Sequence, residues 1–129
     1  MRTAFFVSSI LLILTCTAGS SQPDHLLDVN SFEKKLKNTP DRILLDVRTE
    51  AEYSKGHFPN VILIDIRKST FKGEVSKLNK STPVFVYCAS GIRSEKAVEI
   101  MKALGFQEIY ELEGGFHEWV AAGKPFVED

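Results

Sequence analysis

Short, almost continuously apolar runs recur along this chain and constrain its fold more than any other feature. The runs are residues 42–47, 61–64 and 83–87, with a shorter one at 108–112. Their length and their content of Val, Ile and aromatic residues are typical of β-strands. A strand that is apolar at nearly every position is covered on both faces of its sheet.

Segments with helical character lie around and between these strands. One spans about residues 30–36, with Asn30 or Ser31 as its N-cap. A second spans about residues 94–105, from Ser94 to a stop at a glycine, and its apolar residues recur at the spacing of an amphipathic helix. A third covers residues 116–122. This alternation predicts a single α/β fold with a parallel sheet.

The length and charge of the chain narrow its class. The chain has 129 residues, of which 43% are hydrophobic, so it can bury the core of about one domain. This excludes a disordered chain and a disulfide-stapled mini-protein. A net charge of -1 gives no broad positive field for nucleic acid, so no nucleic-acid partner is expected. We expect a monomer.

The first 20 residues have the layout of a secretory signal peptide. Arg2 precedes an apolar run at residues 4–14, and small residues follow it up to Ser20. A bilayer-spanning helix needs about 20 apolar residues, so this run is too short to be an anchor. The sequence therefore predicts a signal peptide at residues 1–20 and export of residues 21–129, in the first place to the periplasm.

The alternative is a lipoprotein signal, in which Cys16 is acylated. Attachment to a membrane is expected only in that case. In either case Cys88 is the one cysteine of the folded part. Cysteines of exported proteins usually pair, so a single one suggests a reactive thiol or an intermolecular bridge.

The segment after the strand at 83–87 carries the candidate chemistry. Cys88 stands where this strand gives way to a helix, and the N–H groups and dipole of a helix N-terminus favour a thiolate. Gly91 lets the loop curl inward, and Arg93 offers a forked donor for an oxyanion. The loop is predicted to bind substrate through Ala89, Ser90, Gly91, Ile92, Arg93 and Ser94, with Cys88 as the nucleophile. The competing interpretation is a small buried core cysteine.

Other polar residues have weaker functional indications. Asp46 and Arg48 end the strand at 42–47 and could support the pocket or form a structural ion pair. Glu52 is expected to pair with an arginine at the surface, and His57 to be structural. Ser94 could instead cap the helix.

No metal or organic cofactor is predicted, because His25 and His117 have no clustered Cys or Asp partners in the sequence. Gly114-Gly115 is interpreted as a turn or helix entry, with a lesser chance of touching the pocket.

Several motifs together resemble the single-domain rhodaneses, which are sulfurtransferases of the thiosulfate type. The matching pieces are Leu45-Asp46-Val47-Arg48 with Glu52-Tyr53, Gly56-His57-Phe58-Pro59, the loop from Cys88 to Ser94, and Leu112-Glu113-Gly114-Gly115-Phe116 with Trp119, Gly123 and Pro125. The resemblance covers nearly all of residues 21–129. One departure is Asn60-Val61, where the family often has Gly-Ala, and it leaves the shape of that loop in question.

The resemblance implies a rhodanese-like fold, a central parallel sheet of about five strands with helices on both faces. It also implies a ping-pong cycle in which Cys88 becomes a persulfide. The partners would be a small-molecule sulfur donor such as thiosulfate and an acceptor such as cyanide or a thiol.

Two alternatives remain. A phosphatase or arsenate reductase could use the same anion loop, although phosphatases of this kind have five residues between Cys and Arg and this chain has four between Cys88 and Arg93. A rhodanese-like module could also be non-catalytic and bind partners or sense redox state.

Overall fold

The computed structural model describes residues 25–128, so the predicted signal peptide and Cys16 lie outside the described residues. Five strands form one sheet in the order β1-β5-β4-β2-β3, and every pair is parallel. The strands are β1 (Leu26–Leu27), β2 (Ile43–Asp46), β3 (Ile62–Leu63), β4 (Val84–Tyr87) and β5 (Ile109–Leu112). This confirms the expected parallel α/β sheet of about five strands.

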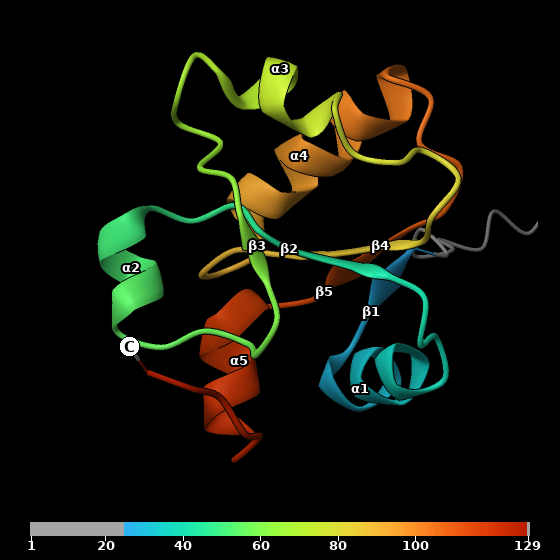
Figure 1. Ribbon diagram of the computed structural model, residues 1–129. Coiled ribbons are helices and arrows are strands. Elements are labelled where there is room, and N and C mark those ends of the chain that lie inside the picture. Colours follow the sequence, from blue (N-terminus) through green and yellow to red (C-terminus); the bar gives the residue numbers. More distant parts are fainter. Residues whose placement is uncertain (1–24, 129) are drawn as a thin grey trace, which may run out of the picture.

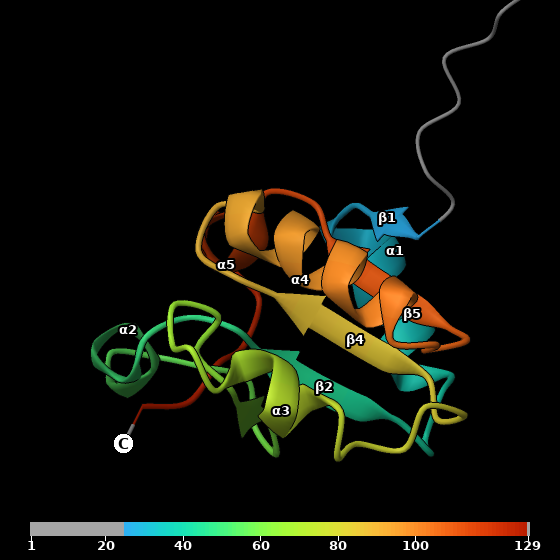
Figure 2. The ribbon, with the colours of Figure 1, turned by 90° about the horizontal axis from the view of Figure 1, so that it is seen from above.

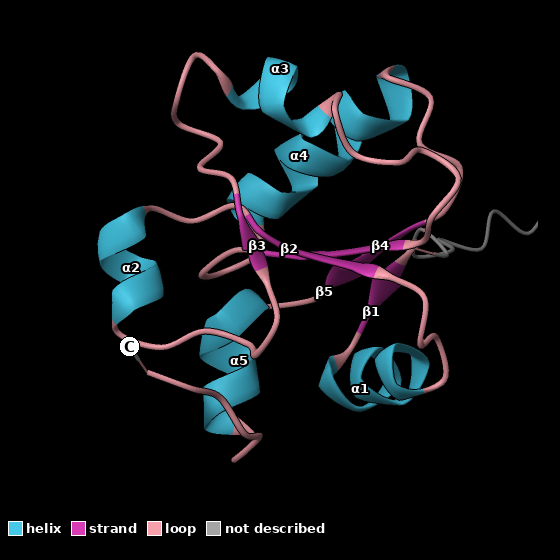
Figure 3. Ribbon diagram, viewed as in Figure 1, coloured by secondary structure: helices cyan, strands magenta, loops and turns pink. Residues whose placement is uncertain are grey.

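Helices cover both faces of the sheet, as expected. They are α1 (Val29–Lys37), α2 (Glu50–Ser54), α3 (Phe71–Val75), α4 (Ile92–Ala103) and α5 (Gly115–Ala121). Figure 1 shows α3 and α4 above the sheet and α1 and α5 below it, with α2 beyond the carboxyl ends of the strands. The view from above places α3 over β2 and α4 along β4 and β5 (Figure 2). Loops join the helices and strands at both ends of the sheet (Figure 3).

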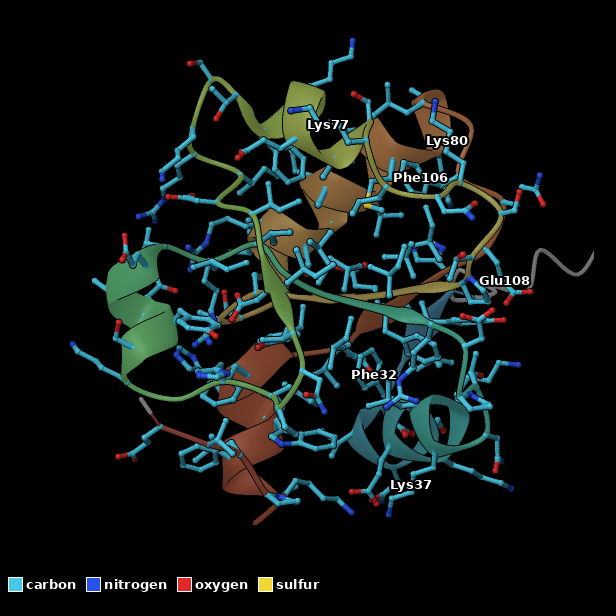
Figure 4. All side chains as sticks on the ribbon, viewed as in Figure 1. Phe32, Lys37, Lys77, Lys80, Phe106 and Glu108 are labelled. Carbon is cyan, nitrogen blue, oxygen red and sulfur yellow. The ribbon has the colours of Figure 1, made fainter. Side chains whose placement is uncertain are left out.

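The two faces of the sheet have different side chains. Along β4, Val84 and Val86 point to the face covered by α3 and α4, whereas Phe85 and Tyr87 point to the other, because strand side chains alternate. The first face, here called the aliphatic face, contains Leu45, Val47, Ile64, Phe71, Val75, Val84, Val86, Cys88, Ala97, Val98, Met101, Phe106 and Ile109. The second, the aromatic face, contains Phe32, Leu36, Leu44, Phe58, Phe85, Tyr87, Leu112, Phe116 and Trp119. Phe106 and Phe32 mark the two faces in Figure 4.

Some element boundaries differ from the sequence prediction. The N-cap of α1 is Asp28, whose side chain accepts from the Ser31 N–H at 2.8 Å, so neither Asn30 nor Ser31 is the cap. Helix α4 begins at Ile92, two residues before the predicted start, and its N-cap is Gly91. The short elements β1, α2 and α3 were not predicted, because two to five residues show no clear period.

The loop before β3 keeps a glycine-like shape despite its departure from the family pattern. Asn60 has a φ of 56°, the left-handed region that asparagine tolerates better than most residues. Asparagine therefore substitutes for glycine at this turn. Over residues 25–128, no helix has the length and apolar character needed to cross a bilayer.

Candidate active site

The loop between β4 and α4 holds the sulfur of Cys88 at the start of a helix. Gly91 has a φ of 100°, a conformation that costs glycine little and turns its N–H inward. This N–H donates to Cys88 Sγ at 3.0 Å. The cysteine is fully buried, and its Sγ therefore meets a backbone donor and the N-terminal end of α4 rather than water.

The turn that leads into α5 supports this loop from the other side. The Phe116 N–H donates to the Cys88 carbonyl at 2.8 Å, and the His117 N–H donates to the Ala89 carbonyl at 3.0 Å. A Cβ on Gly115 would come within 2.5 Å of the Cys88 carbonyl oxygen, so only glycine fits this position. The Gly114-Gly115 turn thus contacts the candidate site, as the less favoured sequence interpretation allowed.

Ser94 connects Cys88 to a buried carboxyl group. Its Oγ lies 3.4 Å from Cys88 Sγ, 2.7 Å from Glu111 Oε2 and 3.2 Å from the Gly91 carbonyl oxygen. Glu111 is 2% exposed, and burial raises the pKa of its carboxyl group although the hydrogen bond from Ser94 opposes the rise. Ser94 is not the N-cap of α4, because it lies inside the helix.

Sequence reasoning missed Glu111. The available signal was a charged residue inside an otherwise apolar strand, because Glu is rarely fully buried without a partner.

Arg93, in the first turn of α4, reaches across to α2. Its guanidinium forms a forked ion pair with Glu52, with contacts of 3.0 and 2.8 Å. The pair raises the pKa of Arg93, and the hydrogen bond to Arg93 lowers the pKa of Glu52. The expected pairing of Glu52 with an arginine is confirmed, whereas substrate binding by Arg93 stays a prediction.

Asp46 and Arg48 form a buried ion pair on the aromatic face. Arg48 Nη2 donates to Asp46 Oδ2 and to the Gly56 carbonyl, both at 2.7 Å, and its guanidinium lies 4.4 Å from the centre of the Phe116 ring. The Tyr87 hydroxyl donates to Asp46 Oδ2 at 2.8 Å. Burial, and then the charge of Asp46, raises the pKa of Tyr87. Burial is also the largest influence on the pKa of Arg48 and lowers it, but the hydrogen bonds and charges of Asp46 and Tyr87 together raise it above its ordinary value. These contacts match the structural alternative; a supporting role in the pocket stays a prediction.

Among the other residues predicted to bind substrate, Ser90 and Ile92 face outward and Ala89 is half-buried. Ser90 and Ile92 are exposed, and Ile92 retains 76% of its accessible surface. Both line a groove of about 520 Å³ that runs along α4 and also includes His25, Glu111 and Gly91. The groove lies next to the loop that holds Cys88, on the aliphatic face of the sheet.

The histidines near the motifs have local partners. His57 is buried, its Nδ1 lies 2.8 Å from the Phe58 carbonyl oxygen, and its ring stacks on Tyr53 at 3.8 Å. Between residues 25 and 128, no three His, Cys, Asp or Glu side chains converge as a metal site would require.

Comparison with known proteins places these features in a family. The family described as Rhodanese-like domain matches residues 23–122. A sulfurtransferase of Allochromatium vinosum is 31% identical over 101 residues, which make up 78% of this chain and 92% of that protein. A tRNA uridine(34) hydroxylase of Chlamydia abortus is 33% identical over 123 residues, but the chain spans only 37% of its length. The crystal structure of a rhodanese-related protein from Thermoplasma volcanium matches with a TM-score of 0.72 and 30% identity, over 81% of this chain and 99% of that one. The parallel sheet, the cysteine loop and these matches together show that the chain belongs to the rhodanese-like domain family.

Proposed function

We propose that this protein is a sulfurtransferase that moves sulfane sulfur from a thiosulfate-type donor to cyanide or a thiol through a persulfide on Cys88. The observation that carries the proposal is the hydrogen bond from the Gly91 N–H to Cys88 Sγ at the N-terminus of α4. A donor in this position stabilises negative charge on sulfur. The family and the sulfurtransferase relative support the same chemistry.

The cycle has two displacements on sulfur. The Cys88 thiolate attacks the outer sulfur of thiosulfate, a new S–S bond forms, and sulfite leaves with the electron pair of the bond that breaks. The acceptor then attacks the outer sulfur of the persulfide, and Cys88 leaves as a thiolate. Because negative charge lies on Cys88 or its attached sulfur in both displacements, the Gly91 N–H serves both steps.

Arg93 is proposed to bind the anionic end of the donor, with the loop residues Ala89, Ser90, Gly91, Ile92 and Ser94 around it. A guanidinium suits a sulfonate-like oxyanion because it offers parallel N–H donors. The ion pair with Glu52 holds this group beside the loop.

Intact mass after incubation with thiosulfate tests the proposal. The purified protein should gain one sulfur atom, lose it on addition of cyanide, and gain none when Cys88→Ser is introduced. Turnover of an aryl phosphate without sulfur uptake would favour the phosphatase alternative instead. An inert thiol with neither activity would favour a non-catalytic binding module.

Export to the periplasm is part of the same proposal and depends on residues 1–20 acting as a signal peptide. Cell fractionation of the wild type and of Cys16→Ala tests it. Soluble export predicts the same periplasmic fraction for both proteins. A membrane-bound wild type that Cys16→Ala releases would show lipid attachment, and retention in the cytoplasm would refute export.

A further inference from the structure

The Ser94 hydroxyl stands between a thiol and a carboxyl group that are both buried. Cys88 is fully buried and Glu111 is 2% exposed. Ser94 Oγ contacts Glu111 Oε2 at 2.7 Å and Cys88 Sγ at 3.4 Å. A chain of two hydrogen-bond contacts therefore connects Cys88, Ser94 and Glu111, from the catalytic loop to β5.

The direction of these hydrogen bonds depends on where the proton is. A hydroxyl has one hydrogen to donate. When Glu111 is ionised, the Ser94 hydroxyl donates to the carboxylate, and its oxygen accepts from the thiol of Cys88. When Glu111 is protonated, the carboxyl donates to Ser94, and the Ser94 hydroxyl donates to the Cys88 thiolate. The same three side chains can thus hold either charged form by reversing two bonds.

We propose that Cys88 and Glu111 share one proton through Ser94, so that Glu111 is a positioning residue that decides when Cys88 is a thiolate. The inference rests on the proposed function, since it names the residue that prepares the nucleophile of that reaction. Transfer of the proton from Cys88 to Glu111 moves the negative charge between the two groups and leaves the total charge of the three side chains unchanged.

Charged groups of both signs lie near Glu111 and influence the pKa of its carboxyl group in opposite directions. His25 Nε2 lies 3.8 Å from Glu111 Oε1. From α4, Glu95 raises the pKa of the Glu111 carboxyl and Lys102 lowers it, while burial is the largest cause and raises it. At the Cys88 end of the chain, the charged neighbour is Arg93, whose positive charge interacts electrostatically with Cys88. With its pKa raised by burial, the Glu111 carboxyl accepts a proton from Ser94 more readily than an exposed glutamate would.

The proton then follows the catalytic cycle without leaving the protein. As Cys88 prepares to attack the donor, its proton passes to Ser94 while the Ser94 proton passes to Glu111. After the acceptor has taken the outer sulfur, the electron pair of the broken S–S bond returns to Cys88 Sγ. The proton returns from Glu111 by the reverse path, and the resting thiol and carboxylate are restored.

The pH dependence of Cys88 alkylation by iodoacetamide tests the inference. Coupled groups lose their protons in two steps, so the wild-type rate should rise in two steps with pH. Glu111→Gln removes the charge and should leave one step at lower pH, with alkylation roughly tenfold faster at about pH 6, the effect of a one-unit shift. Ser94→Ala removes the donor to the thiolate and should move alkylation in the opposite direction, to higher pH.

The matched control is Glu113→Gln. Glu113 is exposed two residues further along the chain and carries the same charge, so its profile should follow the wild type. Wild-type, Glu111→Gln and Glu113→Gln proteins with the same profile would overturn the proposal. So would shifts in the same direction for Glu111→Gln and Ser94→Ala.

The titration of Glu111 gives an independent measurement. The carboxyl ¹³C resonance of Glu111 should titrate in two steps in the wild type and in one step in Cys88→Ala. The same Glu111 titration curve in the wild type and in Cys88→Ala would overturn proton sharing. Neither experiment uses thiosulfate, so proton sharing with no sulfur uptake would refute only the proposed function, and sulfur uptake with uncoupled titrations would refute only this inference.

Discussion

Two buried polar networks lie at the carboxyl ends of neighbouring parallel strands, on opposite faces of the sheet. On the aromatic face, Arg48 and Asp46 neutralise each other, and Tyr87 completes the bonding of the carboxylate. On the aliphatic face, Cys88 and Glu111 are joined by Ser94, which carries no charge. In the first network the buried carboxylate has a cation beside it, so its charge is compensated. In the second network no charge is fixed in place, so the proton can move from Cys88 to Glu111 and leave the thiolate that attacks the donor.

The largest effect should come from breaking the compensated pair. Arg48→Met leaves Asp46 buried beside Tyr87 with no cation, and we expect the free energy of unfolding to fall by about 3–5 kcal/mol. Denaturant unfolding measures this loss. The double variant with Asp46→Leu removes both charges and should recover part of the stability. A double variant as unstable as the single would mean that packing, rather than the unpaired charge, dominates.

A smaller loss should follow removal of one hydroxyl from the same network. The Tyr87 hydroxyl donates to Asp46 at 2.8 Å and accepts from the Phe58 N–H at 3.3 Å. Tyr87→Phe keeps the ring in the aromatic face but removes one hydrogen bond each from Asp46 and from the Phe58 N–H. The free energy of unfolding should therefore fall by about 2 kcal/mol. Thermal unfolding under the same buffer measures it. No change in stability would show that the Arg48 contacts alone satisfy Asp46.

Sequence reasoning found the residues whose neighbours along the chain define their role. Cys88 and Gly91 belong to one strand–loop–helix segment, so their proximity follows from local order, and the long apolar strands follow from their composition. Glu111 was missed as part of the site and Gly115 was only the less favoured interpretation, because each meets the loop from a distant segment. Glu111 reaches Ser94 across 17 positions of sequence, and Gly115 is required only because the Cys88 backbone passes beside it.

The pH dependence of stability should separate the two networks further. Burial raises the pKa of Glu111 above its ordinary value of 4.5, so the folded protein binds this proton more tightly than the unfolded chain does. This contribution favours folding fully below about pH 4.5 and is lost as the pH rises through the raised value. The slope is at most that of one proton, about 1.4 kcal/mol per pH unit.

Unfolding curves of the wild type and Glu111→Gln, measured across this range, isolate the effect. The variant should gain stability relative to the wild type as the pH rises. Glu33 and Glu52, whose carboxyl pKa values are lowered by bonds to Lys124 and Arg93, contribute the opposite trend to both proteins and cancel in the difference. A flat difference curve would mean that Glu111 does not titrate in this window.

The smallest effect is expected at Arg93 and Glu52, which combine features of both networks. The pair is compensated like Asp46 and Arg48, but the side chains keep 20% and 32% of their surface exposed, so Glu52→Gln should lower the free energy of unfolding by less than about 1 kcal/mol. If Arg93 binds the donor, loss of the carboxylate should strengthen attraction of thiosulfate and lower its KM by about two- to threefold. Glu50→Gln, an exposed change of the same charge on α2, controls for the general field. The contrary outcome is an unchanged KM for thiosulfate in Glu52→Gln together with reduced stability. Arg93 would then have a structural role like that of Arg48, because its charge would hold α2 to the loop without acting on the substrate.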